Sequence, residues 1–271
     1  MTIYKTLSLI DTYRCKAKSK NIHELNGRPN RPDLTNFIAE EIWKKVKPRD
    51  NTVLVDVGCG DASLLKKLAS SIPSEHTVKL IGVLPTREEL VRVKKNLHTD
   101  KKICSKEISI IYGHSEALKL PDKFCDYIIC NSVLHGNGQT HDNVNSAIRE
   151  FSRISKVGCQ LYVGEMPDSN EMKSKNYGES LAFWLIYLYR KNGALSFLRG
   201  LKSILVSLFT KEPFVIVPKL MFYMKPNEFK DLLKCHGFQV EKITKHLEIN
   251  VQGRVCKSNT RWNYQAIRVK L

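Results

Sequence analysis

The sequence has no long apolar run free of charges, and it has no pair of cysteines with the spacing C-x-x-C. Because a membrane-spanning helix needs about 20 predominantly apolar residues, we predict no membrane span. Without C-x-x-C pairs we predict neither a zinc site nor a thioredoxin-like site, and no metal is expected. The eight cysteines are scattered, which suits a reducing compartment. Since the N-terminus also lacks a signal-peptide pattern, we predict a cytoplasmic protein.

Acidic residues are scarce relative to basic ones, with 27 Asp and Glu against 44 Lys and Arg and a formal net charge of +17. Such an excess is typical of proteins that meet nucleic acid, an anionic small substrate or an anionic membrane surface. Here Lys and Arg are spread along the whole chain. This dispersal favours a generally basic surface or a local basic pocket, so nucleic acid is a candidate partner but not the favoured one.

Repeats and low-complexity segments are also lacking, and the pattern divides the chain into four segments. Residues 1–33 are basic and turn-rich, and we expect them to be irregular. Residues 34–168 alternate short apolar strands with helices. Residues 169–222 break this alternation, and residues 223–271 contain one helix and two closing strands. Short buried strands separated by helices predict an α/β fold of the doubly wound kind, with a mainly parallel sheet covered on both faces.

Two apolar helices are predicted inside the 169–222 insertion, at residues 181–189 and 195–209. The first is apolar on almost every side, so it must be buried or meet a partner. Two interpretations stay open. The insertion is a helical lid over the acceptor, or it is the contact of a homodimer. Trp184 is its largest anchor in either case.

One stretch points to a ligand. An apolar strand at residues 53–57 runs into Asp56-x-Gly58-x-Gly60, and a helix follows. Glycine lets the backbone turn sharply and approach a ligand closely, and the helix N-terminus offers free N–H groups. A dinucleotide site would need a third glycine, but Ser63 occupies that position.

With these residues the chain resembles the class I methyltransferases that use S-adenosylmethionine (SAM). The resemblance covers about residues 34–165 closely and about the last fifty residues in outline. It rests on five stretches that occur in the family's order, at residues 53–60, 80–84, 112–121, 124–135 and 154–165. It implies a Rossmann-like, seven-stranded sheet with the last strand antiparallel, SAM as the cofactor, and a helical lid insertion.

The resemblance implies a set of cofactor-binding residues that follow the strands: Asp56, Gly58, Cys59, Gly60, Leu84, Pro85, Thr86, His114, Ser115, Glu116, Asn131 and Ser132. Two of them depart from the family's pattern. Leu84 stands where an acidic residue usually grips the ribose, and His114 stands where an aspartate often accepts from adenine. Thr86 and Glu116 are the candidate replacements, and a non-catalytic relative is the alternative.

His135 and Glu165 follow the fourth and fifth strands, on the expected ligand side, and are the candidate catalytic residues. His135 is a base or a substrate contact, or it packs at a helix start. Glu165 faces the acceptor, or it is an ordinary solvated carboxylate. Tyr13, Arg14 and Arg28 are candidates to fold over the cofactor, with plain surface exposure as the alternative.

The acceptor is the least constrained part of the interpretation. Methyltransferases of the adenine-amino type carry Asn/Asp-Pro-Pro-aromatic after the fourth strand, whereas this chain has Asn131-Ser-Val-Leu. We therefore predict a SAM-dependent methyltransferase directed to an oxygen or nitrogen of a small-molecule substrate. Residues 261–264 resemble those of bacterial enzymes acting on sugar or surface-polysaccharide precursors. The alternatives are an RNA-directed methyltransferase and a non-catalytic SAM-binding relative.

Overall fold

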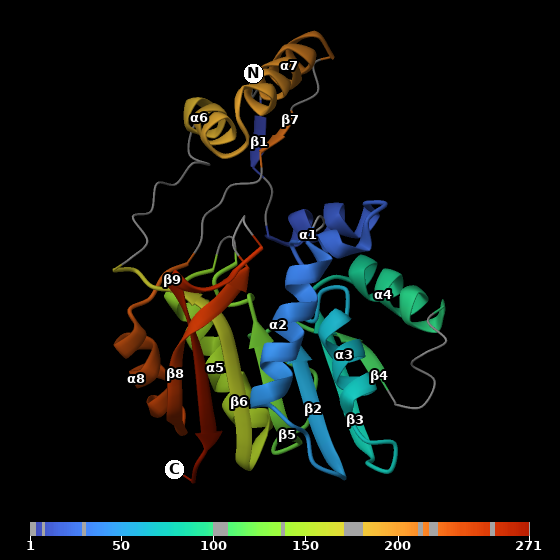
Figure 1. Cartoon of the computed structure of the whole chain (residues 1–271), viewed down its shortest axis with the longest axis vertical. Helices are drawn as coiled ribbons and strands as arrows, with labels where there is room; N and C mark the ends of the chain where they lie inside the picture. Colours follow the sequence, from blue (N-terminus) through green and yellow to red (C-terminus); the bar gives the residue numbers. More distant parts are fainter. Residues whose placement is uncertain are drawn as a thin grey trace.

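The computed structural model describes residues 4–6, 9–28, 31–99, 108–136, 139–170, 181–210, 214–216, 222–249 and 253–270. A seven-stranded sheet forms the centre of the molecule (Figure 1). Its strands are β2 (Thr52–Val57), β3 (Val78–Leu84), β4 (Ile108–Tyr112), β5 (Cys125–Asn131), β6 (Ser155–Pro167), β8 (Phe238–Ile249) and β9 (Val255–Arg268).

The strand order across this sheet is β4-β3-β2-β5-β6-β9-β8. Strand β9 is antiparallel to both of its neighbours, and the other neighbouring pairs are parallel. The order changes direction between β2 and β5, which are adjacent in space but separated along the chain by β3 and β4. The mainly parallel, doubly wound Rossmann-like sheet with an antiparallel last strand is therefore confirmed.

Helices cover both faces of the sheet, as its buried central strands require. On one face lie α2 (Pro32–Lys45), α3 (Ser63–Ser71) and α4 (Arg87–Thr99), which share a hydrophobic core with β2 and β3. On the other lie α5 (His141–Ile154) and α8 (Pro226–Cys235). The apolar residues of each helix recur on one side. Leu65 and Leu68 of α3 and Phe151 of α5, for example, are fully buried.

The expectation of an irregular segment over residues 1–33 is wrong for most of its described residues. Helix α1 (Leu9–Lys18) and the short helix η1 (Ile22–Glu24) lie there. Arg92 of α4 donates hydrogen bonds to the carbonyl oxygens of Lys16 and Ala17, at 3.2 and 2.7 Å, and so holds the end of α1. A helix of ten residues is marginal on its own, so contacts with the rest of the fold hold α1 in place.

The two helices predicted in the insertion are confirmed as α6 (Leu181–Asn192) and α7 (Ala194–Thr210). They lie in a separate lobe beyond the carboxyl ends of the parallel strands (Figure 1). Strand β7 (Phe214–Ile216) pairs there in parallel with β1 (Tyr4–Thr6), a contact that the sequence pattern did not predict. No described helix is long and apolar enough to cross a bilayer.

The closing strands are longer than the expected 239–243 and 264–269, since β8 has 12 residues and β9 has 14. Their added length carries many polar residues, and the pairing of the two strands shifts register twice, after Val240 and after Lys245. Such interruptions break the two-residue alternation by which strands are recognised in a sequence.

The covering of the sheet by α4 can be tested with two valines on that helix. Val93 is fully buried against the sheet, whereas Val91 is 67% exposed. We predict that Val93→Ala lowers the free energy of unfolding by about 2 kcal/mol, because two buried carbons are lost and a small cavity remains. Val91→Ala should change it by less than about 0.5 kcal/mol. Urea denaturation measures both, and equal losses would contradict this packing.

Candidate functional site

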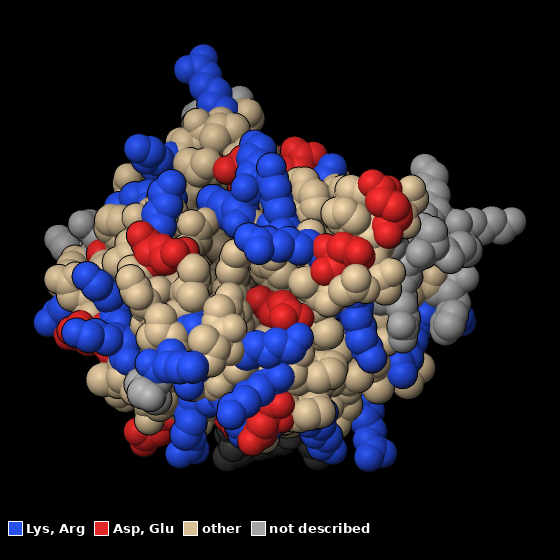
Figure 2. All heavy atoms as spheres, turned by 90° about the horizontal axis from the view of Figure 1, so that it is seen from below, with Lys and Arg blue, Asp and Glu red and all other residues tan. Residues whose placement is uncertain are grey.

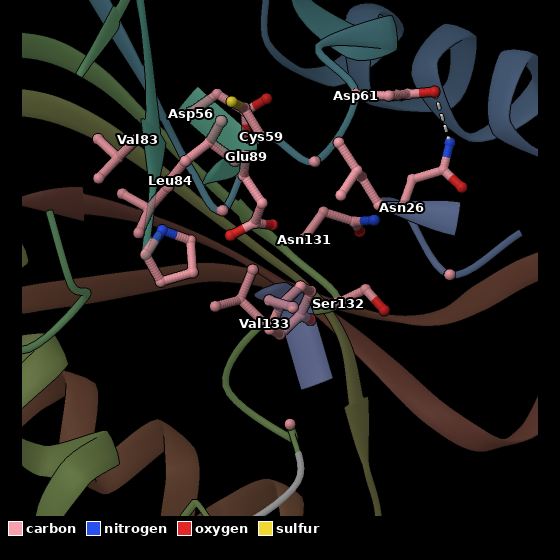
Figure 3. A pocket seen from close by; sticks show the side chains of 18 of the residues that line it. Asn26, Asp56, Cys59, Asp61, Val83, Leu84, Glu89, Asn131, Ser132 and Val133 are labelled. Carbon is pink, nitrogen blue, oxygen red and sulfur yellow. Dashed lines mark hydrogen bonds between the residues drawn. The ribbon is translucent and has the colours of Figure 1, made fainter. Parts of the chain in front are cut away.

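A cavity of about 520 Å³ lies at the carboxyl ends of β2, β3, β4 and β5 (Figure 3). This is where ligands bind in open α/β sheets, next to the point at which the strand order changes direction. The loops after these strands form one side. Helix α1, residues 25–28 and one side of α2 form the other.

The loop after β2 is shaped by its glycines. Gly58 and Gly60 have φ angles of +76° and +56°, which favour glycine. The Gly58 N–H donates to the carbonyl oxygen of Val83 at 3.0 Å. A Cβ at Gly58 would collide with the side chain of Val133, and one at Gly60 would come within 3.3 Å of Asn26. Glycine is thus required here by backbone geometry and by the packing of the cavity wall.

Two carboxylates near this loop differ in their partners. Asp61 is held by Asn26, whose amide donates to it at 3.0 Å, and by His23 at 2.6 Å. Asp56 is 3% exposed and lines the cavity, and its Oδ2 has no hydrogen-bond partner in the described part of the chain. Burial, and secondarily the charge of Asp61, raises the pKa of Asp56 to about 7. A buried carboxylate oxygen without a partner is costly, and a bound cation would satisfy it.

A third carboxylate was missed by the sequence interpretation. Glu89, in the first turn of α4, is 1% exposed and lines the cavity. Its side chain points into the pocket in Figure 3, where Leu84 forms part of the wall. Burial raises its pKa to about 7, although Thr86 and Lys16 act in the opposite direction. This buried acid shares the cavity lining with Leu84.

Thr86 has a different role from the one expected of it. It is not part of the cavity lining; its hydroxyl donates to Glu89 at 2.8 Å and accepts from the Glu89 N–H at 3.2 Å. The spacing Thr86-x-x-Glu89 is that of a capping box, in which the two residues satisfy each other at a helix start. This spacing was the signal in the sequence that could have led to Glu89.

The loop after β4 brings Gly113, His114, Ser115 and Glu116 to the cavity. The Nε2 of His114 lies 3.2 Å from the hydroxyl of Tyr112, and the two rings meet edge to face. Ser115 donates to Glu116 at 3.0 Å. The loop therefore presents one carboxylate, that of Glu116, to the cavity.

His135 lies at the cavity, 8% exposed, with its Nε2 3.2 Å from the hydroxyl of Ser132. Its Nδ1 has no partner in the described part of the chain. Burial, and then the charges of Arg261 and Arg28, lowers the pKa of His135 to about 4. The imidazole is therefore neutral at physiological pH, and its Nδ1 is buried without a partner among the described residues.

Glu165 is 1% exposed, so it is not an ordinary solvated carboxylate. Its Oε1 accepts from Arg28 and, at 3.0 Å, from the Asn131 amide, while its Oε2 accepts from Arg261 at 2.7 Å. Burial would raise its pKa, but Arg28, His246 and Arg261 outweigh that effect and hold the pKa at about 2. A carboxylate that is always ionised and engaged on both oxygens suits positioning of its neighbours better than proton transfer.

Of the three candidates in the N-terminal segment, two line the cavity and one does not. Tyr13 and Arg28 line the cavity, and burial raises the pKa of Tyr13 to about 12. Arg14 points away and forms exposed ion pairs with Asp11 and Glu88. Plain surface exposure is therefore right for Arg14 and wrong for the other two.

Most of the expected site residues meet at one place. The following line the cavity: Asp56, Gly58, Cys59, Gly60, Leu84, Pro85, His114, Ser115, Glu116, Asn131, Ser132 and His135. Thr86 and Glu165 lie behind this lining and contact residues that belong to it. No described residue of the insertion lines the cavity, and the side chain of Trp184 is outside the described residues. Closure of the insertion over the acceptor stays a prediction.

Residues 55–163 match the family model described as a methyltransferase domain. This part of the chain is a SAM-dependent methyltransferase domain. The match runs from β2 to β6 and so covers the strands that surround the cavity. It confirms the class I family and SAM as the cofactor. No curated protein matches the chain in sequence.

Solved structures share the methyltransferase's fold along most of its length. A SAM-dependent methyltransferase from Methanosarcina mazei aligns with a TM-score of 0.56 at 16% identity, covering 85% of this chain and 98% of that one. A chain from the Haloferax volcanii complex between a methyltransferase activator and a methyltransferase gives 0.61 at 11%, covering 97% and 99%. A Thermotoga maritima SAM-dependent methyltransferase gives 0.55 at 15%, covering 96% and 100%. At these identities the likeness shows the fold alone.

The buried state of Glu89 has a measurable consequence for the methyltransferase. Its pKa rises from 4.5 to about 7 on folding, so the native state keeps a proton that the unfolded chain loses. This contribution to stability is present below about pH 4.5 and is lost as the pH rises through about 7, by on the order of 3 kcal/mol.

We predict that Glu89→Gln flattens the decline in unfolding free energy between about pH 5 and 8, measured by urea denaturation at several pH values. The slope is reduced rather than abolished, because Asp56 contributes a decline of the same sign. Glu88→Gln is the matched control, since its side chain is 43% exposed and gives up little hydration on folding. A variant with an unchanged slope would show that Glu89 is not buried as described.

Proposed function

We propose that this methyltransferase transfers the methyl group of SAM to an oxygen or nitrogen of a small-molecule acceptor. The observation that carries the proposal is the lining of the cavity. Its carboxylates are Asp56, Asp61, Glu89 and Glu116, against the two cations Lys16 and Arg28. A cavity lined mainly by acids suits a cationic donor and a small acceptor, and it repels a polyanion.

Specific residues fit the parts of SAM. The unpartnered Asp56 is suited to the ammonium of its amino-acid end, and Glu89 to the ribose hydroxyls in place of the acid that Leu84 displaces. The loop from Gly113 to Glu116 would border the adenine. When bound, SAM supplies an electrophilic methyl group on a positively charged sulfur.

His135 is the residue best placed to meet the acceptor. Its Nδ1 is unpartnered, and its ring is neutral because of burial and the nearby arginines. A neutral imidazole can accept a hydrogen bond from an acceptor O–H or N–H and take the proton as the new bond to the methyl carbon forms. Glu165 acts through its neighbours by holding Arg28 and Asn131 at the cavity wall.

Sugar or surface-polysaccharide precursors are the acceptor class that we favour. Arg261, in the segment that resembles such enzymes, binds the Glu165 carboxylate, and the adjacent Trp262 donates to Asp168 at 3.0 Å. Both side chains are bonded to protein groups behind the cavity wall, so the preference for this acceptor class rests on the resemblance of residues 261–264.

An RNA acceptor is less favoured by the distribution of charge. Figure 2 shows the face at the bottom of Figure 1, at the opposite end of the strands from the cavity, where Lys and Arg side chains are spread widely with Asp and Glu among them. A dedicated RNA-binding surface would gather basic residues around the site. The charged residues that line the cavity are mostly acidic instead.

Calorimetry with SAM tests the cofactor roles. We predict that Asp56→Asn and Glu89→Gln each weaken SAM binding by about 10- to 100-fold, because each removes a charge-assisted hydrogen bond of about 1.5–3 kcal/mol. Glu88→Gln, an exposed neighbour on α4, should bind as the wild type does. Full affinity in both test variants would refute these roles.

Transfer of the labelled methyl group tests the acceptor. We predict turnover with a panel of hydroxylated or amino-bearing sugars and no turnover with RNA at low salt. With an active acceptor, His135→Asn should lower kcat by about 100-fold or more and leave SAM affinity nearly unchanged. Salt-sensitive turnover of RNA would support the alternative acceptor instead. An unchanged kcat would remove His135 from the chemistry.

A further inference from the structure

We propose that the helical lobe, formed by β1, α6, α7 and β7, docks on the surface of an anionic lipid bilayer. The lobe carries most of the large apolar side chains that are exposed in the described part of the chain: Ile186, Tyr189, Leu195, Leu198, Leu205, Val206 and Phe209. Phe209 is 86% exposed and Leu195 is 71% exposed. Outside the lobe the corresponding residues are three scattered valines, at 91, 157 and 255. A soluble monomer rarely gathers so many exposed apolar side chains on two neighbouring helices without a partner for them.

The exposed residues of α7 share one side of the helix. Leu195, Leu198, Leu205 and Phe209 follow one another at intervals of three, seven and four residues, which bring them to the same face. Gly200, in the middle of the helix, is buried on the opposite side. The apolar face of α7 therefore points away from its contacts with the rest of the lobe.

The positive charge of the lobe indicates an anionic partner. Residues 181–210 contain four Lys or Arg and no Asp or Glu. Arg199 and Lys202 are exposed among the apolar residues of α7, and Arg190 is exposed on α6. Apolar side chains at the depth of the acyl boundary, with long basic side chains reaching the phosphates, are the pattern of helices that lie in a membrane interface.

The same charge argues against the lobe being a homodimer contact. Two copies that met through this face would bring together eight cations without one acidic partner in α6 or α7, and such an arrangement is repulsive. The helices are also too short and too interrupted by charge to cross the bilayer, so they would lie on it.

The lobe joins the domain beside the cavity. Strand β1 leads to α1, whose Ile10 and Tyr13 line the cavity. At the other end of the insertion, the Phe222 N–H donates to the carbonyl oxygen of His135 at 3.3 Å. A lobe resting on a bilayer would thus hold the ligand side of the domain toward the lipid.

Co-sedimentation with vesicles tests the proposal with the full-length chain. We expect binding to vesicles of equal parts phosphatidylcholine and phosphatidylglycerol, and at least about tenfold weaker binding to phosphatidylcholine alone. The double variant Leu195→Asp/Phe209→Asp should lose at least about tenfold in binding. Val91→Asp/Val157→Asp is the matched control, because it places the same charges at exposed apolar sites outside the lobe, and it should bind as the wild type does.

Several outcomes would overturn the proposal. The first is equal binding to both kinds of vesicle, and the second is an equal loss of binding in the two double variants. The third is a wild-type protein that is dimeric and does not bind vesicles, and that becomes monomeric in Leu195→Asp/Phe209→Asp. All four substituted side chains are already exposed, so the variants should fold, and circular dichroism checks this. Vesicle binding needs neither SAM nor an acceptor, so a negative result would leave the proposed methyl transfer intact.

Discussion

The buried carboxylate of Glu165 is the interaction on which the site depends, since it binds segments from three distant parts of the chain. Arg28 comes from the N-terminal segment, Asn131 from the end of β5 and Arg261 from β9. Glu165 itself has a φ of +62°, within a register shift of β6. Removing one member of such a group leaves the remaining charges buried without partners, which costs far more than an exposed pair would. The cavity wall therefore forms as a unit.

The chain as a whole is strongly basic, whereas the side chains around its cavity are mainly acidic. The chain carries +17 overall, yet most charged side chains around the cavity are carboxylates, and two of them have pKa values raised to about 7. The buried acids are destabilising in the empty fold because they lack full hydration. A bound cationic ligand offsets the free-energy cost of burying these acids. The acids therefore lower the stability of the empty protein and favour binding of its cofactor.

The sequence was sufficient for the features that depend on local pattern. The parallel sheet, the loop from Asp56 to Gly60 and the two insertion helices follow from short-range spacing, and the structure contains them. Glu89 was missed because its role depends on burial against Lys16 and the cavity, although its spacing from Thr86 was visible. The cluster around Glu165 was hidden for a stronger reason, since it joins residues as far as 137 positions apart.

The pairing of β1 with β7 imposes an order on how the protein is made. Tyr4 lies opposite Phe214, so β1 has no neighbouring strand until β7, a segment far later in the chain, has been made. Contacts between such distant residues form slowly because a long loop must close first. The sheet from β2 to β6 lies wholly within that loop and can assemble earlier. The apolar lobe is therefore completed only after this part of the sheet can form, and β8 and β9, which follow β7 in the chain, then complete the sheet.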